Sequence, residues 1–267
     1  MKKAGLDPSR APQSMAELQT DLQAIRKLGA GYYGFAVSTA DKNSFVLDYF
    51  TPWLWSFGGE VIGADGRPAV TMPQAVAAVD WYKSMVKSGV MPAGRTIRDT
   101  RTLFAGDKVG FTVEGPWIVG VLRSVSGKGK AYDDNWFAAP IPGSAKEIGW
   151  SFPSHHMLVM ASTCKNKKEA WEFMEFLATD RQFTKEYYDA TGLLPVLKSQ
   201  LTSPDFAGKV TQVTLDQLEK CRAPRAWGKN YDRIADAVVP HIRDAAEGAD
   251  ARSSMQKAAQ QMERLNK

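Results

Sequence analysis

Residues 102–118 read Thr-Leu-Phe-Ala-Gly-Asp-Lys-Val-Gly-Phe-Thr-Val-Glu-Gly-Pro-Trp-Ile. The pattern predicts a helix that stops at Gly106 and, after a turn, an apolar strand over 109–113. This strand runs directly into Glu114-Gly115-Pro116-Trp117. Glycine permits a sharp bend there, and proline suits the first turn of the next helix. We therefore expect Trp117 at a strand-to-helix corner, beside amides that are not yet bonded within the helix.

A corner of this kind is suited to binding a small polar ligand. The free amides can receive ligand oxygens, and an indole face can cover apolar C–H surface. Glu114, just before the corner, can accept two hydroxyl hydrogen bonds. The alternative is that Trp117 is a core tryptophan beneath an ordinary turn.

The rest of the chain alternates helical and strand patterns, which predicts an α/β fold. Strands are expected at 33–37, 109–113 and 157–161, and a hairpin over 61–70. Helices are expected at 15–28, 46–56, 72–87, 118–125, 166–178, 180–190, 210–221, 229–246 and 250–265.

Several stretches resemble, in the same order, one family: the extracellular solute-binding proteins of family 1. The resemblance is to their sugar-binding, maltose-binding-like group, which serves ABC importers. Each motif is weak alone, but the shared order is specific and covers nearly the whole chain. The matching stretches are 3–8 with 14–18, 54–62, 65–68, 72–92, 102–118 and Leu193-Leu194-Pro195-Val196.

The resemblance implies an α/β fold of the periplasmic-binding-protein type, class II, with a complete C-terminal lobe and a fragment of the N-terminal lobe. It assigns 1–152 to the first part of the C-terminal lobe and 197–267 to its helical second part. Residues 153–196 would be the partial N-terminal-lobe segment, with one strand and two helices. Because residues 3–8 match a segment that follows the first lobe crossing in relatives, we expect about 100–150 residues of family sequence to be absent upstream.

Composition fits an ordinary globular chain and gives no sign of nucleic-acid binding. The net charge is +5, and the basic residues are scattered without interleaved aromatics. No apolar run is long enough to span a membrane, and we expect no signal peptide in this chain. The resemblance implies a full-length form that is periplasmic or extracellular and membrane-associated.

The two cysteines give no metal motif. Cys164 and Cys221 are far apart in sequence and form no CxxC pair, so they are two free thiols or one disulfide, and free thiols are favoured. We expect no cofactor and no metal. His155 and His156 are adjacent, so in a strand they would face opposite sides and rarely bind one ion.

The resemblance also implies a ligand cleft between two lobes, where aromatic rings stack on sugar rings and polar groups bind hydroxyls. Carried onto this sequence, the expected ligand-binding residues come from four places: Trp117 with Glu114 and Gly115; Tyr231; Trp150 with Ser151; and Tyr49 with Phe50. Trp150 stands where the family often has a small residue, which predicts a narrower pocket or a different ligand. Each aromatic residue can instead belong to the core.

Three functions besides oligosaccharide binding remain open. Arg225, Lys229 and Arg233 near Tyr231 can bind the phosphate of glycerol 3-phosphate or another polyol phosphate. A folded remnant that binds nothing is the second alternative, because relatives close both lobes over the solute. A glycoside hydrolase is the third: Glu114 with Asp48 or Asp232 would be the carboxylate pair, although no spacing requires it. We expect that the chain is not an enzyme.

Two kinds of partner follow from the same pattern. The resemblance implies the membrane subunits of an ABC transporter as partners of the full-length form. In addition, the apolar residues of 166–178 point around much of the helix, whereas a surface helix needs only one apolar stripe. We therefore expect exposed apolar surface in 153–196, and either self-association, segment swapping or mobility there.

Overall fold

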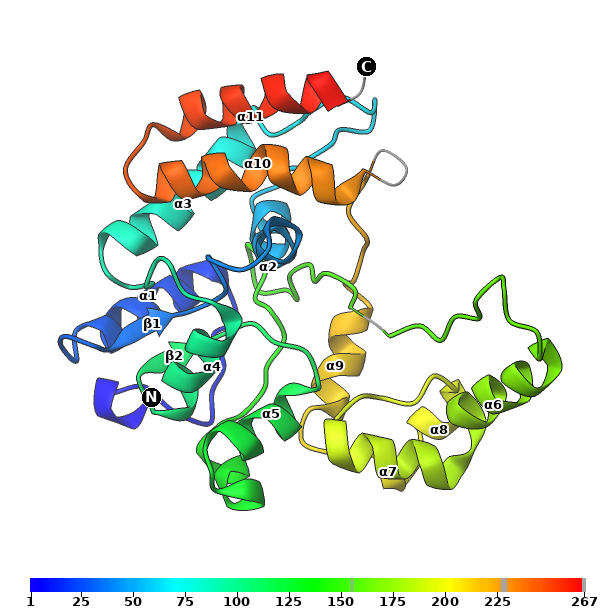
Figure 1. The fold of residues 1–267 in the computed structure, drawn as a ribbon. Coiled ribbons are helices and arrows are strands. Elements are labelled where there is room, and N and C mark those ends of the chain that lie inside the picture. The colour runs from blue at the N-terminus through cyan, green and yellow to red at the C-terminus, as the bar shows by residue number, and fades with distance from the viewer. Residues whose placement is uncertain (155, 227–229, 266–267) are drawn as a thin grey trace. The chain divides into compact units, whose positions relative to one another are not determined.

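The computed structural model describes residues 1–154, 156–226 and 230–265. The chain divides into two compact units, which are described separately. Unit 1 is Met1–Val113, Pro140–Phe152 and Lys220–Lys267, and unit 2 is Glu114–Ala139 and Pro153–Glu219. Helices dominate both units, and Figure 1 shows the elements in chain order.

Unit 1 holds a parallel pair of short strands. Strand β1 (Tyr33–Phe35) pairs with β2 (Val109–Phe111), with Tyr33 opposite Val109 and Phe35 opposite Phe111. The other elements are the 3₁₀ turn η1 (Lys2–Ala4) and the helices α1 (Met15–Arg26), α2 (Asn43–Ser56), α3 (Pro73–Lys87), α4 (Ile97–Ala105), α10 (Tyr231–Ala246) and α11 (Ala251–Leu265). A single antiparallel bridge, Ile62 to Pro68, stands where the hairpin over 61–70 is predicted.

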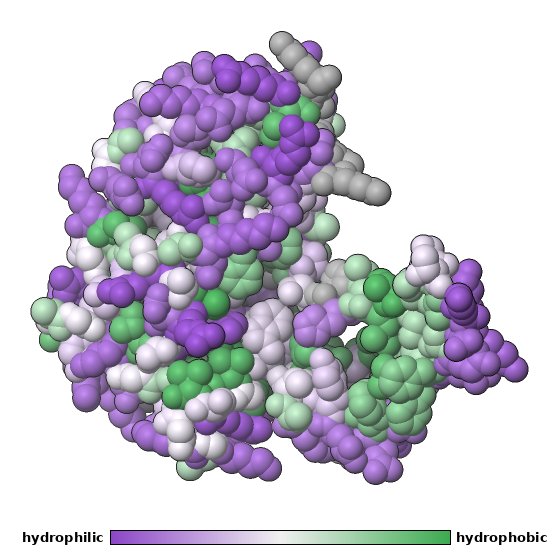
Figure 2. Space-filling model, viewed as in Figure 1, coloured by the Kyte–Doolittle hydropathy of each residue, from purple (hydrophilic) through white to green (hydrophobic). Residues whose placement is uncertain are grey.

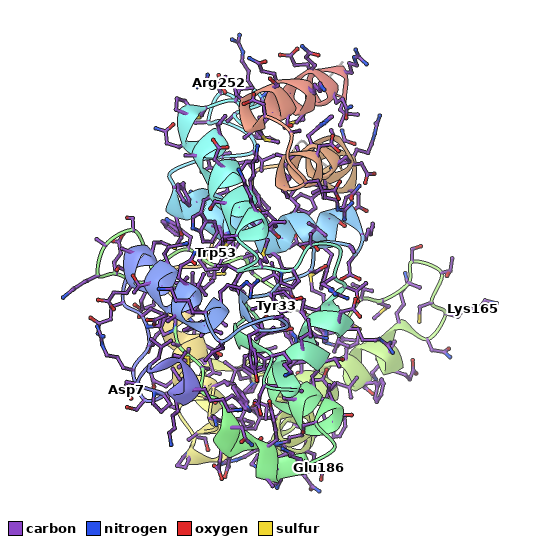
Figure 3. All side chains as sticks on the ribbon, turned by 90° about the vertical axis from the view of Figure 1, so that its left-hand side faces the viewer. Asp7, Tyr33, Trp53, Lys165, Glu186 and Arg252 are labelled. Atoms are coloured by element: carbon purple, nitrogen blue, oxygen red, sulfur yellow. The ribbon has the colours of Figure 1, made fainter. Side chains whose placement is uncertain are left out.

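Helix α2 is the centre of the unit 1 core. Its residues are apolar on almost every side, and most of those from Val46 to Trp55 are buried. A helix that is hydrophobic all round has to be covered on all sides. Helices α3 and α10 pack against α2, and α11 lies along α10 (Figure 1). Trp53, 2 % exposed, points from α2 into this core (Figure 3).

Unit 2 contains only helical elements among its described residues. These are α5 (Ile118–Val125), the 3₁₀ turn η2 (Gly129–Asn135), α6 (Lys167–Thr179), α7 (Arg181–Thr191), α8 (Lys198–Leu201), the 3₁₀ turn η3 (Pro204–Phe206) and α9 (Thr211–Leu218). The small centre of the unit joins Tyr188 to η3 and α9. The Tyr188 hydroxyl bonds the Thr211 hydroxyl at 2.8 Å, and its ring meets Phe206 edge-on.

The boundaries of the compact units differ from the predicted segments 1–152, 153–196 and 197–267. Residues 114–139 belong to unit 2, where α5 packs against α7, and residues 197–219 also belong to it, where η3 contacts α7. Gly120 makes the close approach possible, since a Cβ there would lie 2.7 Å from the Ala190 carbonyl oxygen. The assignment of the segments to lobes of the family stays a prediction.

The predicted strand at 157–161 is wrong. The structure has irregular backbone over these residues, and Met157, Leu158 and Val159 are 72 %, 51 % and 81 % exposed. A strand needs a neighbour for its backbone groups, and this segment pairs with no other described segment. The two helices expected after it are confirmed as α6 and α7.

Two further expectations concern the cysteines and the membrane. Cys164 and Cys221 are both free thiols, as expected. Across the described ranges, no helix is both long and apolar enough to cross a bilayer.

Candidate functional site

The two parallel strands end at the same edge of unit 1, and ligands of α/β proteins bind beyond the carboxyl ends of such strands. A groove of about 400 Å³ lies beyond the end of β1. We call it the β1 groove. It is lined by Asp41, Lys42, Ser44, Phe45 and Asp48, which lie just before or within the start of α2, and by Ile97 of α4.

The loop that forms one wall of the groove is held by a single arginine. Arg243 of α10 donates Nε–H to the Thr39 carbonyl oxygen at 2.7 Å and Nη2–H to that of Asp41 at 2.8 Å. Its Nη1 donates to Asn43 Oδ1 at 2.7 Å. The planar guanidinium can satisfy three acceptors at once, which fixes the path of the chain between β1 and α2.

Asp41 has a structural role at this loop. One of its carboxylate oxygens, Oδ2, accepts the Ile97 amide at 2.6 Å and the Ser38 hydroxyl at 2.6 Å. The contact places a negative charge at the first turn of α4, where the helix dipole favours it.

Asp48 is the central polar group of the groove. Its Oδ1 accepts the hydroxyl of Tyr231, at the start of α10. Burial raises the pKa of the Asp48 carboxyl to about 6, the Tyr231 hydrogen bond opposes this, and the charge of Asp232 adds to it. Burial, with the charge of Asp48, also raises the pKa of Tyr231, which is therefore a neutral donor.

The groove thus combines an apolar wall with hydroxyl-binding groups. Phe45 is half-buried, with its ring 5.0 Å from the Tyr49 ring in an edge-on arrangement. The second oxygen of Asp48, Oδ2, has no hydrogen-bond partner within the described parts of the chain and can accept a ligand hydroxyl. Lys42 and Asp232 form an exposed ion pair at 2.8 Å, which contributes little to stability.

A second groove, of about 580 Å³, lies on α1. Its lining includes Lys3, Lys27, Gln19 and Gln23, but no aromatic side chain and no carboxylate. It therefore lacks the aromatic ring and the carboxylates that distinguish the β1 groove, so the smaller groove is the stronger candidate.

The structure places the predicted site residues of unit 1 in different settings. Tyr231 borders the β1 groove through Asp48, and its ring centre lies 6.4 Å from that of Phe152. Tyr49 is 9 % exposed and Phe50 is 3 % exposed, and both belong to the core around α2. Phe50 packs edge-on against Tyr82, which favours a core role.

The ring of Trp150 makes cation–π contacts with two basic side chains, Arg222 and Lys220. The Arg222 guanidinium carbon lies 4.3 Å from the Trp55 ring centre and 4.7 Å from that of Trp150. Arg222 also bonds Glu60 at 3.0 Å, and Lys220 lies 5.4 Å from the Trp150 ring centre. Stacking between two rings orients a guanidinium firmly. A ligand that stacks on Trp150 has to share the ring with these groups.

Ser151 lies beside this stack in a short parallel bridge. Its amide donates to the Lys220 carbonyl oxygen at 2.8 Å, and its own carbonyl accepts from the Arg222 amide at 3.2 Å. The backbone of Ser151 is therefore used by the fold.

In unit 2, the corner predicted from 114–117 is formed. The Trp117 indole Nε1–H donates to Glu114 Oε2 at 2.9 Å, so Glu114 orients the ring. Gly115 is required there, because a Cβ at this position would overlap the six-membered ring of Trp117. Trp117 is half-buried and keeps part of its surface open.

One detail of this corner differs from the expectation. Helix α5 begins at Ile118, and the amides of Ile118 and Val119 already donate to the carbonyls of Gly115 and Pro116. The turn before the helix uses these donors, so they are not free for ligand oxygens.

The remaining predicted residues are the basic side chains considered for a phosphate and the histidine pair considered for a metal. Arg225 lies 3.6 Å from Glu60 and Arg233 is exposed, whereas Lys229 and His155 lie outside the described residues. No cluster of His, Cys, Asp or Glu able to hold a metal occurs in the portion of the chain that the structure describes.

Residues 1–212 match the family model described as bacterial extracellular solute-binding protein. The chain belongs to this family. This solute-binding protein is 28 % identical over 202 residues to a protein of Brucella abortus described as a binding protein. The match covers 74 % of the chain and 47 % of the relative, so the chain spans about half the length of that curated relative.

Solved structures share the fold of this solute-binding protein. The sugar-binding protein MalE of Xanthomonas citri matches with a TM-score of 0.80 and 20 % identity, over 99 % of this chain and 65 % of that one. UgpB of Mycobacterium tuberculosis, in complex with glycerophosphocholine, matches with a TM-score of 0.72 and 21 % identity, over 100 % of this chain and 67 % of that one. The predicted periplasmic-binding-protein-like fold and the predicted family are therefore confirmed.

Sequence reasoning missed Phe45 as a site residue, and it named Asp48 only as one half of a hydrolase carboxylate pair, not as a ligand-binding residue. The available signal was Asp48 itself, the one charged residue of a mostly apolar helix, between Leu47 and Tyr49. A carboxylate in such a helix needs a partner or a function.

The raised pKa of Asp48 leads to a testable pH dependence. Its ordinary value is 3.8 and its folded value about 6, so from about pH 4 to pH 6 the folded state holds a proton that the unfolded state has lost. The contribution of Asp48 to stability therefore falls as the pH rises through this window. We expect Asp48→Asn to gain in melting temperature relative to the parent between pH 4 and pH 7.

The control is Asp80→Asn, which removes one exposed carboxylate from α3. Its melting temperature is expected to follow the parent at every pH. Parallel pH profiles for the parent and Asp48→Asn would show that the carboxyl is not perturbed by the fold.

Proposed function

We propose that this chain is the solute-binding component of an ABC-type importer and binds a carbohydrate, with an oligosaccharide favoured. The observation that carries the proposal is the β1 groove, where the apolar wall of Phe45 and Ile97 faces the acceptors of Asp48. Sugars present an apolar C–H face and a ring of hydroxyls, and this combination is complementary to both. The fold is shared with MalE, described as sugar-binding, and with UgpB, solved with glycerophosphocholine. The shared fold is therefore compatible with a sugar or with a glycerol phosphate compound.

The charge of the groove favours a neutral sugar over a polyol phosphate. Asp41 and Asp48 line it, and the one lysine, Lys42, is already paired with Asp232. A phosphate in this groove would meet the two carboxylates, and the one lysine in its lining is shared with Asp232. Arg225 is occupied by Glu60 and by the carbonyl oxygen of Ile62 at 3.5 Å.

Glycoside cleavage has weaker support than binding. Asp48 is bonded by Tyr231, and Asp232 by Lys42 and Ser44, so both of the predicted unit 1 partners of Glu114 make hydrogen bonds within the protein. A hydrolase needs two carboxylates that flank one bond, and the other carboxylate that lines the β1 groove, Asp41, is held by the Ile97 amide and the Ser38 hydroxyl.

The test is calorimetric titration of the chain with monosaccharides, maltodextrins, polyols and glycerol phosphate. We expect a sugar to bind, and Phe45→Ala to weaken it by about 1–1.5 kcal/mol, roughly tenfold, through loss of stacking. Asp48→Asn keeps the shape of the carboxylate but changes an acceptor into a donor, and is expected to weaken binding to a similar degree.

The matched control is Phe137→Ala, which removes a partly exposed phenylalanine of unit 2, and it should bind as the parent does. Glycerol phosphate binding with no sugar response would replace the carbohydrate proposal by the polyol phosphate alternative. If no ligand gives a binding signal in the titration, the alternative of a folded remnant that binds nothing would be favoured.

A further inference from the structure

Tyr231 is held in a fixed place by the helix that it begins. Helix α10 packs against α2, α3 and α11, and its buried residues include Ile234, Val238 and Ile242. Hydrophilic side chains cover the outer surface over α10 and α11 (Figure 2). A helix with one closely packed side cannot rotate or shift without losing those contacts. The fold of unit 1 therefore fixes the position of Tyr231 relative to α2.

Tyr231 reaches the β1 groove through its hydroxyl rather than through its ring. Among the described residues, Asp48 lines the groove and Tyr231 does not. The Tyr231 ring centre lies 6.4 Å from that of Phe152, with the two planes tilted by 38°. Its hydroxyl donates to Asp48 Oδ1. A molecule in the groove therefore meets Asp48, and Tyr231 acts on that molecule through this carboxyl.

The hydrogen bond gives the two oxygens of Asp48 different roles. Burial and the charge of Asp48 raise the pKa of Tyr231, so the phenol keeps its proton and donates it to Oδ1. The other oxygen, Oδ2, has no hydrogen-bond partner within the described parts of the chain. A proton taken up by the carboxyl therefore binds at Oδ2. In the ionised carboxyl Oδ2 accepts a hydrogen bond, and in the protonated carboxyl it donates one.

The charged groups of α10 contact the start of α2 or the loop before it. Asp232 is paired with Lys42, and its charge adds to the burial that raises the pKa of Asp48. Asp236 accepts a hydrogen bond from the first residue of α2 at 2.8 Å, and Arg243 holds the loop before α2. Within the described residues, none of these groups bonds Asp48.

The other elements around Asp48 also leave its charge without a bonded cation among the described residues. From α4 the groove receives the uncharged Ile97, whose amide is bonded by Asp41. From α3, Tyr82 is neutral, because burial holds its pKa far above the usual range. The Tyr231 hydroxyl is therefore the one described group whose contact favours the ionised form of Asp48.

We propose that Tyr231 is a positioning residue of the β1 groove: its hydroxyl holds Oδ1 of Asp48, so that a sugar hydroxyl binds at Oδ2 of the ionised carboxylate. This inference rests on the proposed binding of a sugar in the groove. A hydrogen bond to a carboxylate is stronger than one between neutral groups. Uptake of one proton by Asp48 therefore removes the acceptor and weakens binding.

The sugar affinity of the parent is expected to follow the ionisation of Asp48. Burial raises the pKa of this carboxyl to about 6. About one molecule in ten is then ionised at pH 5, so the apparent affinity should fall roughly tenfold between pH 7.5 and pH 5. Asp48→Asn has no carboxyl to titrate, so its affinity should be the same at both pH values. A parent affinity that is equal at both pH values overturns the proposal.

Tyr231→Phe tests the positioning role, because it keeps the ring and removes only the hydroxyl. The hydroxyl contact lowers the pKa of Asp48, so the variant should have a higher pKa than the parent. Calorimetric titration between pH 5 and pH 8 would use maltotriose, or the sugar of the panel that binds most tightly. We expect the variant to lose affinity at a higher pH than the parent. A ring that stacks on the sugar, or that only packs in the fold, would give coincident pH profiles and overturn the proposal.

A measurement without sugar separates this proposal from the proposed function. Carbon-13 NMR of labelled aspartate side chains follows the Asp48 carboxyl directly, and Asp48→Asn identifies its signal. We expect a higher midpoint in Tyr231→Phe than in the parent. Sugar binding with equal midpoints overturns the proposal and leaves the proposed function standing. Absence of sugar binding at every pH overturns the proposed function, and a raised midpoint then still supports Tyr231 as the group that holds Asp48.

Two further variants complete the test. Asp232→Asn replaces an exposed carboxylate whose charge raises the pKa of Asp48, so the loss of affinity should move to lower pH, opposite to Tyr231→Phe. An unmoved profile overturns the link between binding and this proton, even if Tyr231→Phe folds poorly. The matched control is Tyr32→Phe, which removes a phenol hydroxyl before β1, at the end of the strand away from the groove. Its affinity and pH profile should match those of the parent.

Discussion

Replacement of Trp53 by alanine is expected to lower the free energy of unfolding by about 3–5 kcal/mol, as for other buried large-to-small changes. The indole is 2 % exposed, at the centre of the unit 1 core. Its ring meets Phe35 of β1 edge-on at 5.3 Å and Trp81 of α3 at 5.3 Å. The cavity would therefore separate three elements at once. Urea unfolding followed by circular dichroism should show a lower midpoint with an unchanged slope.

Two variants make this prediction specific. The Trp53 Nε1–H is buried without a hydrogen-bond partner in the described ranges, so Trp53→Phe loses no hydrogen bond and should cost only about 1 kcal/mol. Met72→Ala removes an exposed apolar side chain of the same unit and should cost within about 0.5 kcal/mol. If Met72→Ala cost as much as Trp53→Ala, the core assigned to α2 would be wrong.

The elements predicted correctly are those whose ends are coded locally. The helix that ends near Gly106, the strand after it and the helix at 118–125 all form close to the predicted residues. Glycine and proline act on the backbone of their own neighbourhood, so the sequence alone is sufficient there. The Trp117 corner was predictable for the same reason.

The segment 157–161 shows where this reasoning fails. Its apolar residues match a strand pattern, but a strand is stable only when another strand or a covering layer accepts it. Here Val159 is 81 % exposed and the backbone is irregular. Nothing within the segment encodes whether a partner is present.

The candidate site also contains residues that the sequence predicts and residues that only the fold brings together. Aromatic residues at a motif are visible in a sequence, and Tyr231 does border the β1 groove. The pairing of Asp48 with Tyr231 joins residues 183 positions apart. Phe50 carries the same aromatic signal as Phe45, yet only the fold decides that Phe50 faces Tyr82 and Phe45 faces the groove.

Arg243→Ala is expected to weaken both the fold and the ligand site. The guanidinium donates to the carbonyl oxygens of Thr39 and Asp41 and to Asn43 Oδ1, all within 2.7–2.8 Å. Removing it leaves three part-buried acceptors without their donor, which should cost about 2–4 kcal/mol in total. The loop that carries Asp41 and Lys42 would lose its anchor, so sugar affinity should fall about tenfold or more.

The two effects can be separated by the choice of variant. Arg243→Lys keeps the positive charge but cannot reach three acceptors with one planar group, so it should recover part of the stability and little of the affinity. Arg252→Ala removes an exposed arginine of α11 and should change neither. Titration calorimetry at a temperature where every variant is folded measures the affinity, and urea unfolding measures the stability. Arg243→Ala with parental affinity would show that the groove does not depend on this loop, and the ligand would then have to be sought at the Trp117 corner.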